Sequence, residues 1–124
     1  MDLIRLATVN IDCPDALALS EFYRKLLGWE KRWADEDFVI IADPAGGVQL
    51  SFQTEANYVA PVWPDEAGKP GKSMHLDLQV KDLGRAERHA LSLGAVRAAE
   101  QFLEKEGVVV FLDPAGHPFC LFID

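Results

Sequence analysis

The chain has 124 residues, 49 % of them apolar and 26 % charged, which suits one globular domain with a core that needs no disulfide or metal. The formal net charge of −8 argues against a nucleic-acid partner, because binding a phosphate backbone requires clustered Lys and Arg. Cys13 and Cys120 stand outside any Cys-x-x-Cys spacing and no apolar run approaches ~18 residues, so we expect a reduced cytoplasmic protein without a membrane span.

The first half of the chain predicts one helix among four strands. Residues 3–11 alternate loosely between apolar and polar and predict a strand. Residues 12–15 then open a helix that Gly28 ends. Its buried stripe is formed by Leu19, Phe22, Tyr23 and Leu26. Strands follow at 29–33, 38–42 and 47–53, and the residues 43–46 form the turn between the last two.

The second half repeats this order after a segment rich in proline and glycine. Residues 54–72 predict a linker, in which Trp63 is either an anchor on the protein body or part of a ligand site. Residues 74–80 predict a strand with His75, Asp77 and Gln79 on one face. Asp82 opens a helix that ends at Gly94, and strands follow near 95–100, 107–112 and 118–123.

One tetrapeptide marks the two halves as copies of a single unit. The sequence Asp-Pro-Ala-Gly occurs at 43–46 and at 113–116, which are 70 positions apart (113 − 43), and Asp12 and Asp82 keep the same offset (82 − 12). The chain is therefore predicted to be a single α+β domain made of two β-α-β-β-β modules around a cleft. Module one spans 1–53, the linker 54–72 and module two 73–124.

Several runs resemble the vicinal oxygen chelate superfamily, which groups glyoxalase I, bleomycin-resistance proteins, fosfomycin-resistance enzymes and extradiol dioxygenases. They are DCPD at 12–15, EFY at 21–23, LLGW at 26–29, HLDLQVKDL at 75–83 and DPAGHPFCL at 113–121. Within the superfamily, the chain is most similar to short glyoxalase-like domain proteins. The resemblance implies curved sheets around a cleft that a homodimer often completes. It does not specify a reaction, because the fold hosts metalloenzymes and plain binding proteins alike.

The resemblance also implies where a metal would bind. Metalloenzymes of the superfamily take one ligand from the first strand and one from the last strand of each module, usually His, Glu or Gln. His75 matches such a position, Gln49 stands where Glu is usual, and Cys120 stands in place of the second Glu. The counterpart of His75 in the first strand is Leu6 or Arg5, which do not bind metal. We therefore expect no metal cofactor; if a divalent ion is bound, its ligands are Gln49, His75 and Cys120.

His75 and Asp77 are the candidate catalytic residues. Side chains at i and i+2 of a strand point the same way, so the carboxylate stands next to the imidazole. The pair suits a general base with its orienting partner, and it equally suits a hydrogen-bonded polar pair in a wide cleft. Cys120, between Phe119 and Leu121, is expected to pack as a small hydrophobe.

Two main functions follow from these residues. The first is a binding protein of the bleomycin-resistance type, which holds a small molecule without a cofactor. Its cleft is lined by Gln49, Phe52, Trp63, His75, Asp77 and Phe119. The second is a metal-dependent lyase or isomerase of the glyoxalase type that acts on a small oxygenated substrate. A third is a module for protein association. We expect a small-molecule ligand and a homodimer, and neither a nucleic-acid nor a membrane partner.

Overall fold

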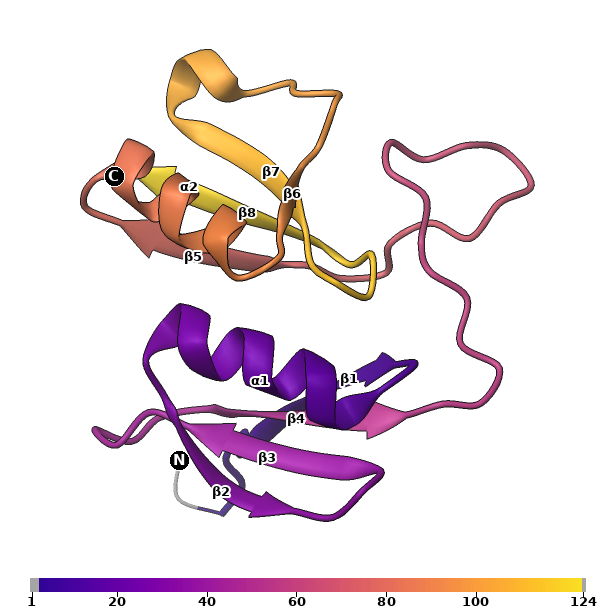
Figure 1. Cartoon of the computed structure of the whole chain (residues 1–124), viewed down its shortest axis with the longest axis vertical. Coiled ribbons are helices and arrows are strands. Elements are labelled where there is room, and N and C mark those ends of the chain that lie inside the picture. Colours follow the sequence, from indigo (N-terminus) through magenta and orange to yellow (C-terminus); the bar gives the residue numbers. More distant parts are fainter. Residues whose placement is uncertain (1–2, 124) are drawn as a thin grey trace. The chain divides into compact units, whose positions relative to one another are not determined.

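A computed structural model describes residues 3–123 and divides the chain into two compact units, Met1–Tyr58 and Val59–Asp124. Each unit holds one four-stranded sheet and one α-helix, as the α+β prediction required (Figure 1). The boundary cuts through the predicted linker. Thr54 ends a strand of the first unit, and residues 59–72 belong to the second.

The first unit contains β1 (Thr8–Cys13), α1 (Ala16–Leu27), β2 (Glu30–Ala34), β3 (Phe38–Ala42) and β4 (Gln49–Thr54). The strand order is β1-β4-β3-β2, with β1 parallel to β4 and the other pairs antiparallel. The predicted first strand began at residue 3, but β1 begins at Thr8. Its only neighbour, β4, begins at Gln49, whose N–H donates to the Ala7 carbonyl (2.9 Å), so the earlier residues have no strand to pair with.

Helix α1 lies against one face of the first sheet. The Asp15 carboxylate caps its start by accepting from the Ala18 N–H (3.3 Å), and Gly28 ends it in the left-handed conformation (φ 70°). Leu19, Phe22 and Tyr23 of the predicted stripe are buried, and the Tyr23 ring stacks on Phe52 with 5.6 Å between centroids. Leu26 is only half-buried.

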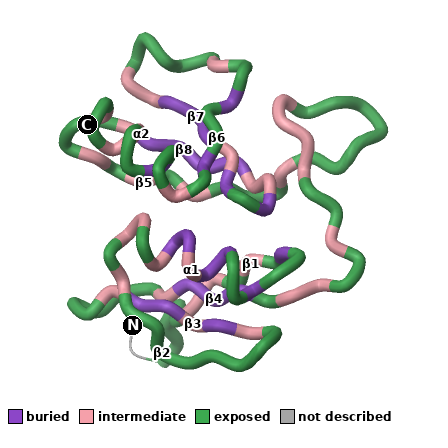
Figure 2. The backbone as a smooth tube through the Cα atoms, in the orientation of Figure 1, coloured by how far each residue is buried: buried purple, intermediate pink, exposed green. Residues whose placement is uncertain are grey.

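Strand β2 forms an exposed edge of the first sheet. All five of its residues are exposed, and the pairing with β3 shifts between Lys31 and Trp33, where a bulge interrupts the ladder. Trp33 lies beside Phe38, with 6.1 Å between ring centroids. Buried residues concentrate on α1, β3 and β4 instead (Figure 2).

The second unit contains β5 (Leu76–Val80), α2 (Leu83–Ser92), β6 (Val96–Arg97), the 3₁₀ turn η1 (Glu104–Glu106), β7 (Val108–Leu112) and β8 (Pro118–Ile123). The order β5-β8-β7-β6 repeats that of the first sheet, again with a parallel first pair. Helix α2 begins after Asp82, whose carboxylate accepts from the Arg85 N–H (3.0 Å), as predicted. It ends at Ser92, short of the predicted Gly94.

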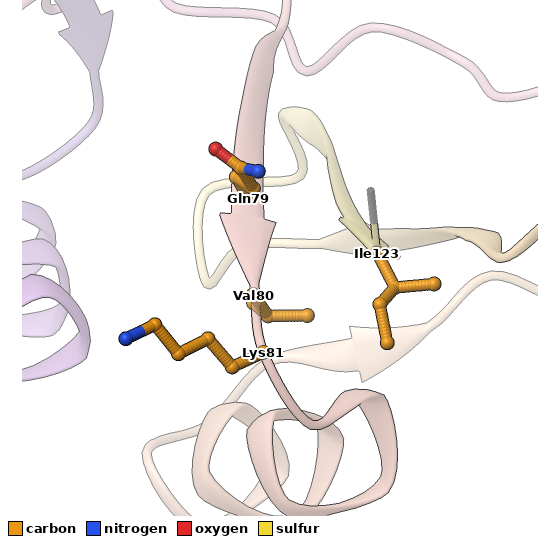
Figure 3. A pocket seen from close by; sticks show the side chains of 4 residues that line it. All are labelled: Gln79, Val80, Lys81 and Ile123. Carbon is orange, nitrogen blue, oxygen red and sulfur yellow. The ribbon is translucent and has the colours of Figure 1, made fainter.

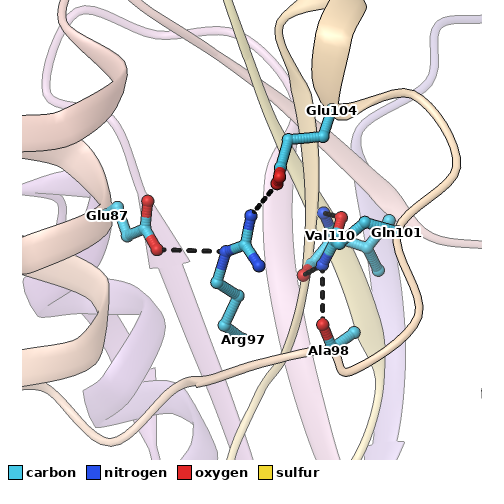
Figure 4. Close-up of polar contacts among 6 residues, drawn as sticks. All are labelled: Glu87, Arg97, Ala98, Gln101, Glu104 and Val110. Atoms are coloured by element: carbon cyan, nitrogen blue, oxygen red, sulfur yellow. Dashed lines mark hydrogen bonds and ion pairs between the residues drawn. The ribbon is translucent and has the colours of Figure 1, made fainter.

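Strand β6 is much shorter than the predicted 95–100, because the Gln101 side chain takes the place of a strand. Its amide donates to the carbonyls of Ala98 and Val110 (2.8 Å each) and accepts from the Val110 N–H (2.9 Å). Arg97 ties this segment to α2 through Glu87 (3.2 Å) and to η1 through Glu104 (Figure 4).

The repeated Asp-Pro-Ala-Gly forms the same turn twice. Asp43 accepts from the Ala45 N–H and Asp113 from the Ala115 N–H, both at 2.9 Å. The loops around them differ by one residue. Eight residues separate the paired Ile41 and Leu50 (50 − 41 − 1), whereas seven separate Phe111 and Phe119 (119 − 111 − 1).

Candidate functional site

The candidate site lies on one face of the second sheet, where the parallel strands β5 and β8 meet. Asp77 pairs with Cys120 across these strands. Phe119 and Leu121, on either side of Cys120, are 0 % and 2 % exposed and lie on the opposite face, because successive strand side chains alternate. The Cys120 side chain therefore shares its face with Asp77.

His75 completes a three-residue cluster with Asp77 and Cys120, called here the polar cluster. It lies just before β5, since that strand begins at Leu76 and not at residue 74 as predicted. The His75 Nε2 atom is 3.2 Å from Asp77 Oδ1, and the donor atoms of the three residues all lie within 4.8 Å of one another. An imidazole, a carboxylate and a thiol thus converge at one point of the surface.

The Cys120 thiol is held in its neutral form. Its pKa is raised to about 11, mainly by burial and also by the negative charge and hydrogen bond of Asp77, while the positive charge of Lys72 opposes the shift. The S–H group therefore donates to the Asp77 carboxylate at neutral pH. A thiol in this state is a poor nucleophile, so the cluster favours hydrogen bonding over covalent chemistry.

An apolar wall stands beside the polar cluster. Ala98, Val110 and Cys120 form a small buried group against which Trp63 packs. The Trp63 indole N–H donates to the Glu100 carbonyl (3.3 Å), which fixes the ring over the sheet. Trp63 is thus an anchor on the body of the second unit, one of the two alternatives expected for it, and its place in a ligand pocket stays a prediction. The packing of Cys120 as a hydrophobe is confirmed by its 8 % exposure.

The other predicted pocket residues are not brought to this cluster. Phe52 and Phe119 are each 0 % exposed and stack on Tyr23 and Phe111, so the prediction that they line the pocket is wrong. Both lie on the inward-facing side of their strands, which the sequence alone did not reveal. Gln49 is half-buried at the start of β4, in the first unit.

Strand pairing also corrects which residues of the two modules correspond. Ile40 and Val110 each stand three residues before the turn aspartate (43 − 40 and 113 − 110); their partners are Ser51 and Cys120. The parallel neighbours of these two are Asn10 and Asp77. Asp77 therefore corresponds to Asn10, and the first-strand counterpart of His75, two residues earlier, is Thr8 rather than Leu6 or Arg5. The one-residue difference between the hairpin loops accounts for one of the three residues by which the 70-position offset fails (70 − (77 − 10) = 3).

The first module holds a neutral version of this cross-strand pair. The Ser51 hydroxyl donates to the Asn10 Oδ1 atom (2.8 Å), in the place of the Cys120 thiol and the Asp77 carboxylate. Both modules thus have a polar pair at equivalent strand positions, and only the second adds a histidine and a charge.

The polar cluster has donors that fit a divalent metal. Imidazole nitrogen, carboxylate oxygen and thiolate sulfur are all zinc ligands, and three protein ligands leave a position open for a substrate. Asp77 replaces Gln49 in the set predicted from the sequence. The ion would have to displace the Cys120 proton, which the raised pKa opposes.

Lys72 is a neighbour of the cluster that the sequence analysis missed. Its ammonium lies 5.0 Å from the centre of the Trp63 ring and acts on the Cys120 thiol. It stands three positions before His75, within the segment taken as a linker, so no strand or helix pattern marked it.

A separate pocket opens at the end of β5. It is lined by Gln79, Val80, Lys81 and Ile123, and the Lys81 side chain extends away from Val80 and Ile123 (Figure 3). Lys81 is the one charged residue among these four, and the pocket contains none of the polar cluster. We assign no chemistry to it.

Comparisons with known proteins agree with the fold. A family model described as "Glyoxalase-like domain" matches residues 8–122. A search of curated proteins found no significant relative. None of the helices in residues 3–123 has the length and apolar character needed to cross a membrane.

Solved structures match nearly the whole chain. A glyoxalase/bleomycin resistance protein/dioxygenase family enzyme from Burkholderia phytofirmans PsJN has a TM-score of 0.71 at 17 % identity, covering 97 % of this chain and 98 % of that one. A possible glyoxalase from Bacillus cereus gives 0.69 at 14 %, covering 96 % and 98 %. Lactoylglutathione lyase from Agrobacterium tumefaciens gives 0.62 at 15 %, covering 99 % and 97 %. At these identities the likeness establishes the fold alone.

Proposed function

This chain belongs to the glyoxalase-like domain family, and we propose that it binds a small oxygenated molecule at the polar cluster of His75, Asp77 and Cys120. The observation that carries the proposal is the convergence of three different hydrogen-bonding groups within 4.8 Å. They lie beside the apolar wall against which Trp63 packs. Small-molecule sites combine such an apolar wall with a few polar groups that fix orientation.

The three groups have complementary roles toward a ligand. Asp77 accepts hydrogen bonds and orients His75 through the 3.2 Å contact, which uses Nε2 and leaves Nδ1 for a ligand. The neutral Cys120 thiol contributes a weak donor that the carboxylate already engages. A hydroxyl of the ligand would donate to Asp77 or to a ring nitrogen of His75, both of which are exposed, rather than bind to the buried thiol.

Binding can be tested with a panel of small hydroxy and carbonyl compounds, titrated into ¹⁵N-labelled protein and followed by amide chemical shifts. Compounds that bind should shift residues 75–77 and 120 and should lose affinity in His75→Gln. His89→Gln is the matched control, because His89 lies on α2 and not in the cluster. Hits whose shifts lie elsewhere, or that bind His75→Gln as tightly as the parent, would contradict the proposal.

A metal-dependent lyase or isomerase is the second candidate, favoured by the mixed nitrogen, oxygen and sulfur donors of the cluster. His75, Asp77 and Cys120 would hold the ion, which would polarise an oxygen of the substrate. The comparison with a lactoylglutathione lyase supports this candidate through the fold only. Equilibrium dialysis against Zn²⁺, Ni²⁺ and Mn²⁺ tests it. One ion bound per chain, lost in both His75→Gln and Cys120→Ser, would favour the enzyme; no stoichiometric ion would exclude it.

We also propose that two copies associate, as the resemblance to the superfamily implied. Light scattering coupled to size-exclusion chromatography gives the mass in solution. The chain mass is 13.8 kDa, so a species at this value over the accessible concentration range would contradict a dimer.

A further inference from the structure

Lys72 carries a positive charge with an unusual set of neighbours. The chain has 20 carboxylate residues and 12 Lys and Arg residues, so a lysine has many possible anionic partners. Yet none of the ion pairs formed among residues 3–123 includes Lys72. Its ammonium is half-buried over the Trp63 ring at 5.0 Å. An aromatic face attracts a cation but does not neutralise its charge.

The segment that carries Lys72 is held in place on the second unit. The Val62 N–H donates to the Pro70 carbonyl (2.7 Å) and closes the segment into a loop. The Trp63 indole is bonded to Glu100, and its ring contacts Phe102 edge-on at 5.9 Å. Lys72 is thereby kept next to the polar cluster by contacts that do not depend on a ligand.

The surroundings of the ammonium suit a particular kind of molecule. Lys72 and Asp77 are the charged residues that act on Cys120, and they shift its pKa in opposite directions, so a cation and a carboxylate both lie near the thiol. Phe102, which contacts the Trp63 ring edge-on, is 62 % exposed and adds an accessible aromatic surface next to Trp63. A flat apolar group can rest there while an anionic group meets the ammonium.

We propose that Lys72 is the anion-recognition residue of the site and that the ligand is a small carboxylate bearing a flat apolar group. This inference rests on the proposed binding function and specifies its ligand class. The carboxylate pairs with Lys72, the flat group lies on Trp63 and Phe102, and a further oxygen of the ligand reaches His75. A carboxylate is a stronger partner for an ammonium than an aromatic ring, so the ligand draws Lys72 from the ring.

The test uses benzoate as the probe and benzamide, its uncharged isostere, as the comparison. Both are titrated into the full chain with ¹⁵N amide shifts as the readout. Benzoate, which carries the carboxylate and the flat group but no further oxygen, should bind saturably with shifts at residues 63, 72 and 102, and about tenfold more tightly than benzamide, the factor expected for one charge-assisted hydrogen bond. Lys72→Met should remove this preference, and Lys72→Arg should keep most of it.

Lys69→Met is the matched control. Lys69 lies in the same loop but is ion-paired with Glu66 (3.4 Å), so its loss should leave benzoate binding unchanged. Methionine can still pack on Trp63, and an unchanged amide spectrum in the rest of the chain shows that the Lys72→Met variant is folded. Equal binding of benzoate and benzamide, no saturable benzoate binding, or an unaltered preference in Lys72→Met would each overturn the inference.

The outcomes separate this inference from the binding function beneath it. If uncharged oxygenated compounds bind through His75 and benzoate binds no more tightly than benzamide, Lys72 is not an anion-recognition residue. The proposed binding function would still stand. If benzoate binds through Lys72 but none of the hydroxy and carbonyl compounds loses affinity in His75→Gln, the anion site stands and the polar cluster is not the recognition group.

Discussion

Asp77 and Cys120 are cross-strand neighbours on β5 and β8, and the thiol of Cys120 donates its hydrogen to the carboxylate of Asp77. The carboxylate also contacts His75, so it receives two polar groups from one side of the sheet. In the first module, the Ser51 hydroxyl donates to Asn10 in the same arrangement. The fold thus provides a polar pair in each module, and the sequence makes only one of them charged.

The reactivity of Cys120 should follow its raised pKa. In a Cys13→Ala background, alkylation by iodoacetamide should be slow at pH 7–8 and should increase toward the thiol pKa of about 11. Asp77→Asn removes the negative charge and should move the profile to lower pH, whereas Asp37→Asn, which lies in the first unit, should not. Mass spectrometry of the modified peptide measures the rate.

The same shift has a consequence for stability. The pKa of the thiol has its ordinary value of 9.0 when the chain is unfolded and is raised to about 11 when it is folded. Between these values the unfolded state holds fewer protons, so the free energy of unfolding should fall as pH rises through this window. Cys120→Ala should weaken that fall. A profile that is equally steep in both proteins would contradict the assignment.

Phe52 should behave as a core residue. Because it is 0 % exposed and stacks on Tyr23, Phe52→Ala should lower the free energy of unfolding by about 3–5 kcal/mol. Urea unfolding followed by circular dichroism measures this loss. The neighbouring exposed Gln53 provides the control, since Gln53→Ala should change stability little. A small loss in Phe52→Ala would restore the original assignment of Phe52 to the pocket.

Gln101 should hold the segment between β6 and β7 closed. Gln101→Ala removes three hydrogen bonds and leaves the Val110 N–H without its acceptor, a cost of about 1–3 kcal/mol. Hydrogen exchange at the Val110 amide should accelerate, while exchange at the Phe119 amide on the far side of the hairpin should change less. Unchanged protection at Val110 would show that another group supports this segment.

The two turn aspartates should differ in importance. Asp113 is 4 % exposed and accepts from the Ala115 and His117 N–H groups, whereas Asp43 is half-buried and its carboxylate accepts from Ala45. Asp113→Ala should therefore destabilise by about 1–3 kcal/mol and Asp43→Ala by less. Asn, which also forms this turn, should restore much of the loss at both sites. Thermal unfolding of the four variants gives the comparison.

The sequence predicted the architecture because the signals for it are local. Caps at Asp15 and Asp82 and the two Asp-Pro-Ala-Gly turns depend on neighbouring residues only, and each is found where it was expected. Strand alternation, by contrast, cannot say which face is covered. For that reason Phe52 and Phe119 were placed in the pocket although both face the core.

The site was predicted in part for the same reason. The His75–Asp77 pair follows from spacing along one strand, and the structure brings the two together at 3.2 Å. Cys120 joins them through a pairing between the distant strands β5 and β8, which no local spacing encodes; in the sequence, only the family resemblance groups it with His75. The 5.0 Å contact between Lys72 and Trp63 depends on a loop whose path no periodicity encodes.

The bulge in β2 has a bearing on self-association. An edge strand offers unpaired N–H and C=O groups to any other extended chain, and a regular, apolar edge invites stacking into fibrils. Here the bulge between Lys31 and Trp33 interrupts the edge, and Glu30, Lys31 and Arg32 place charges along it. Both features oppose regular pairing with another strand. Sheet-to-sheet extension through β2 is therefore disfavoured. If two copies form a dimer, we expect them to use a surface other than β2. For the same reason, the exposed Trp33 should not promote aggregation through this edge.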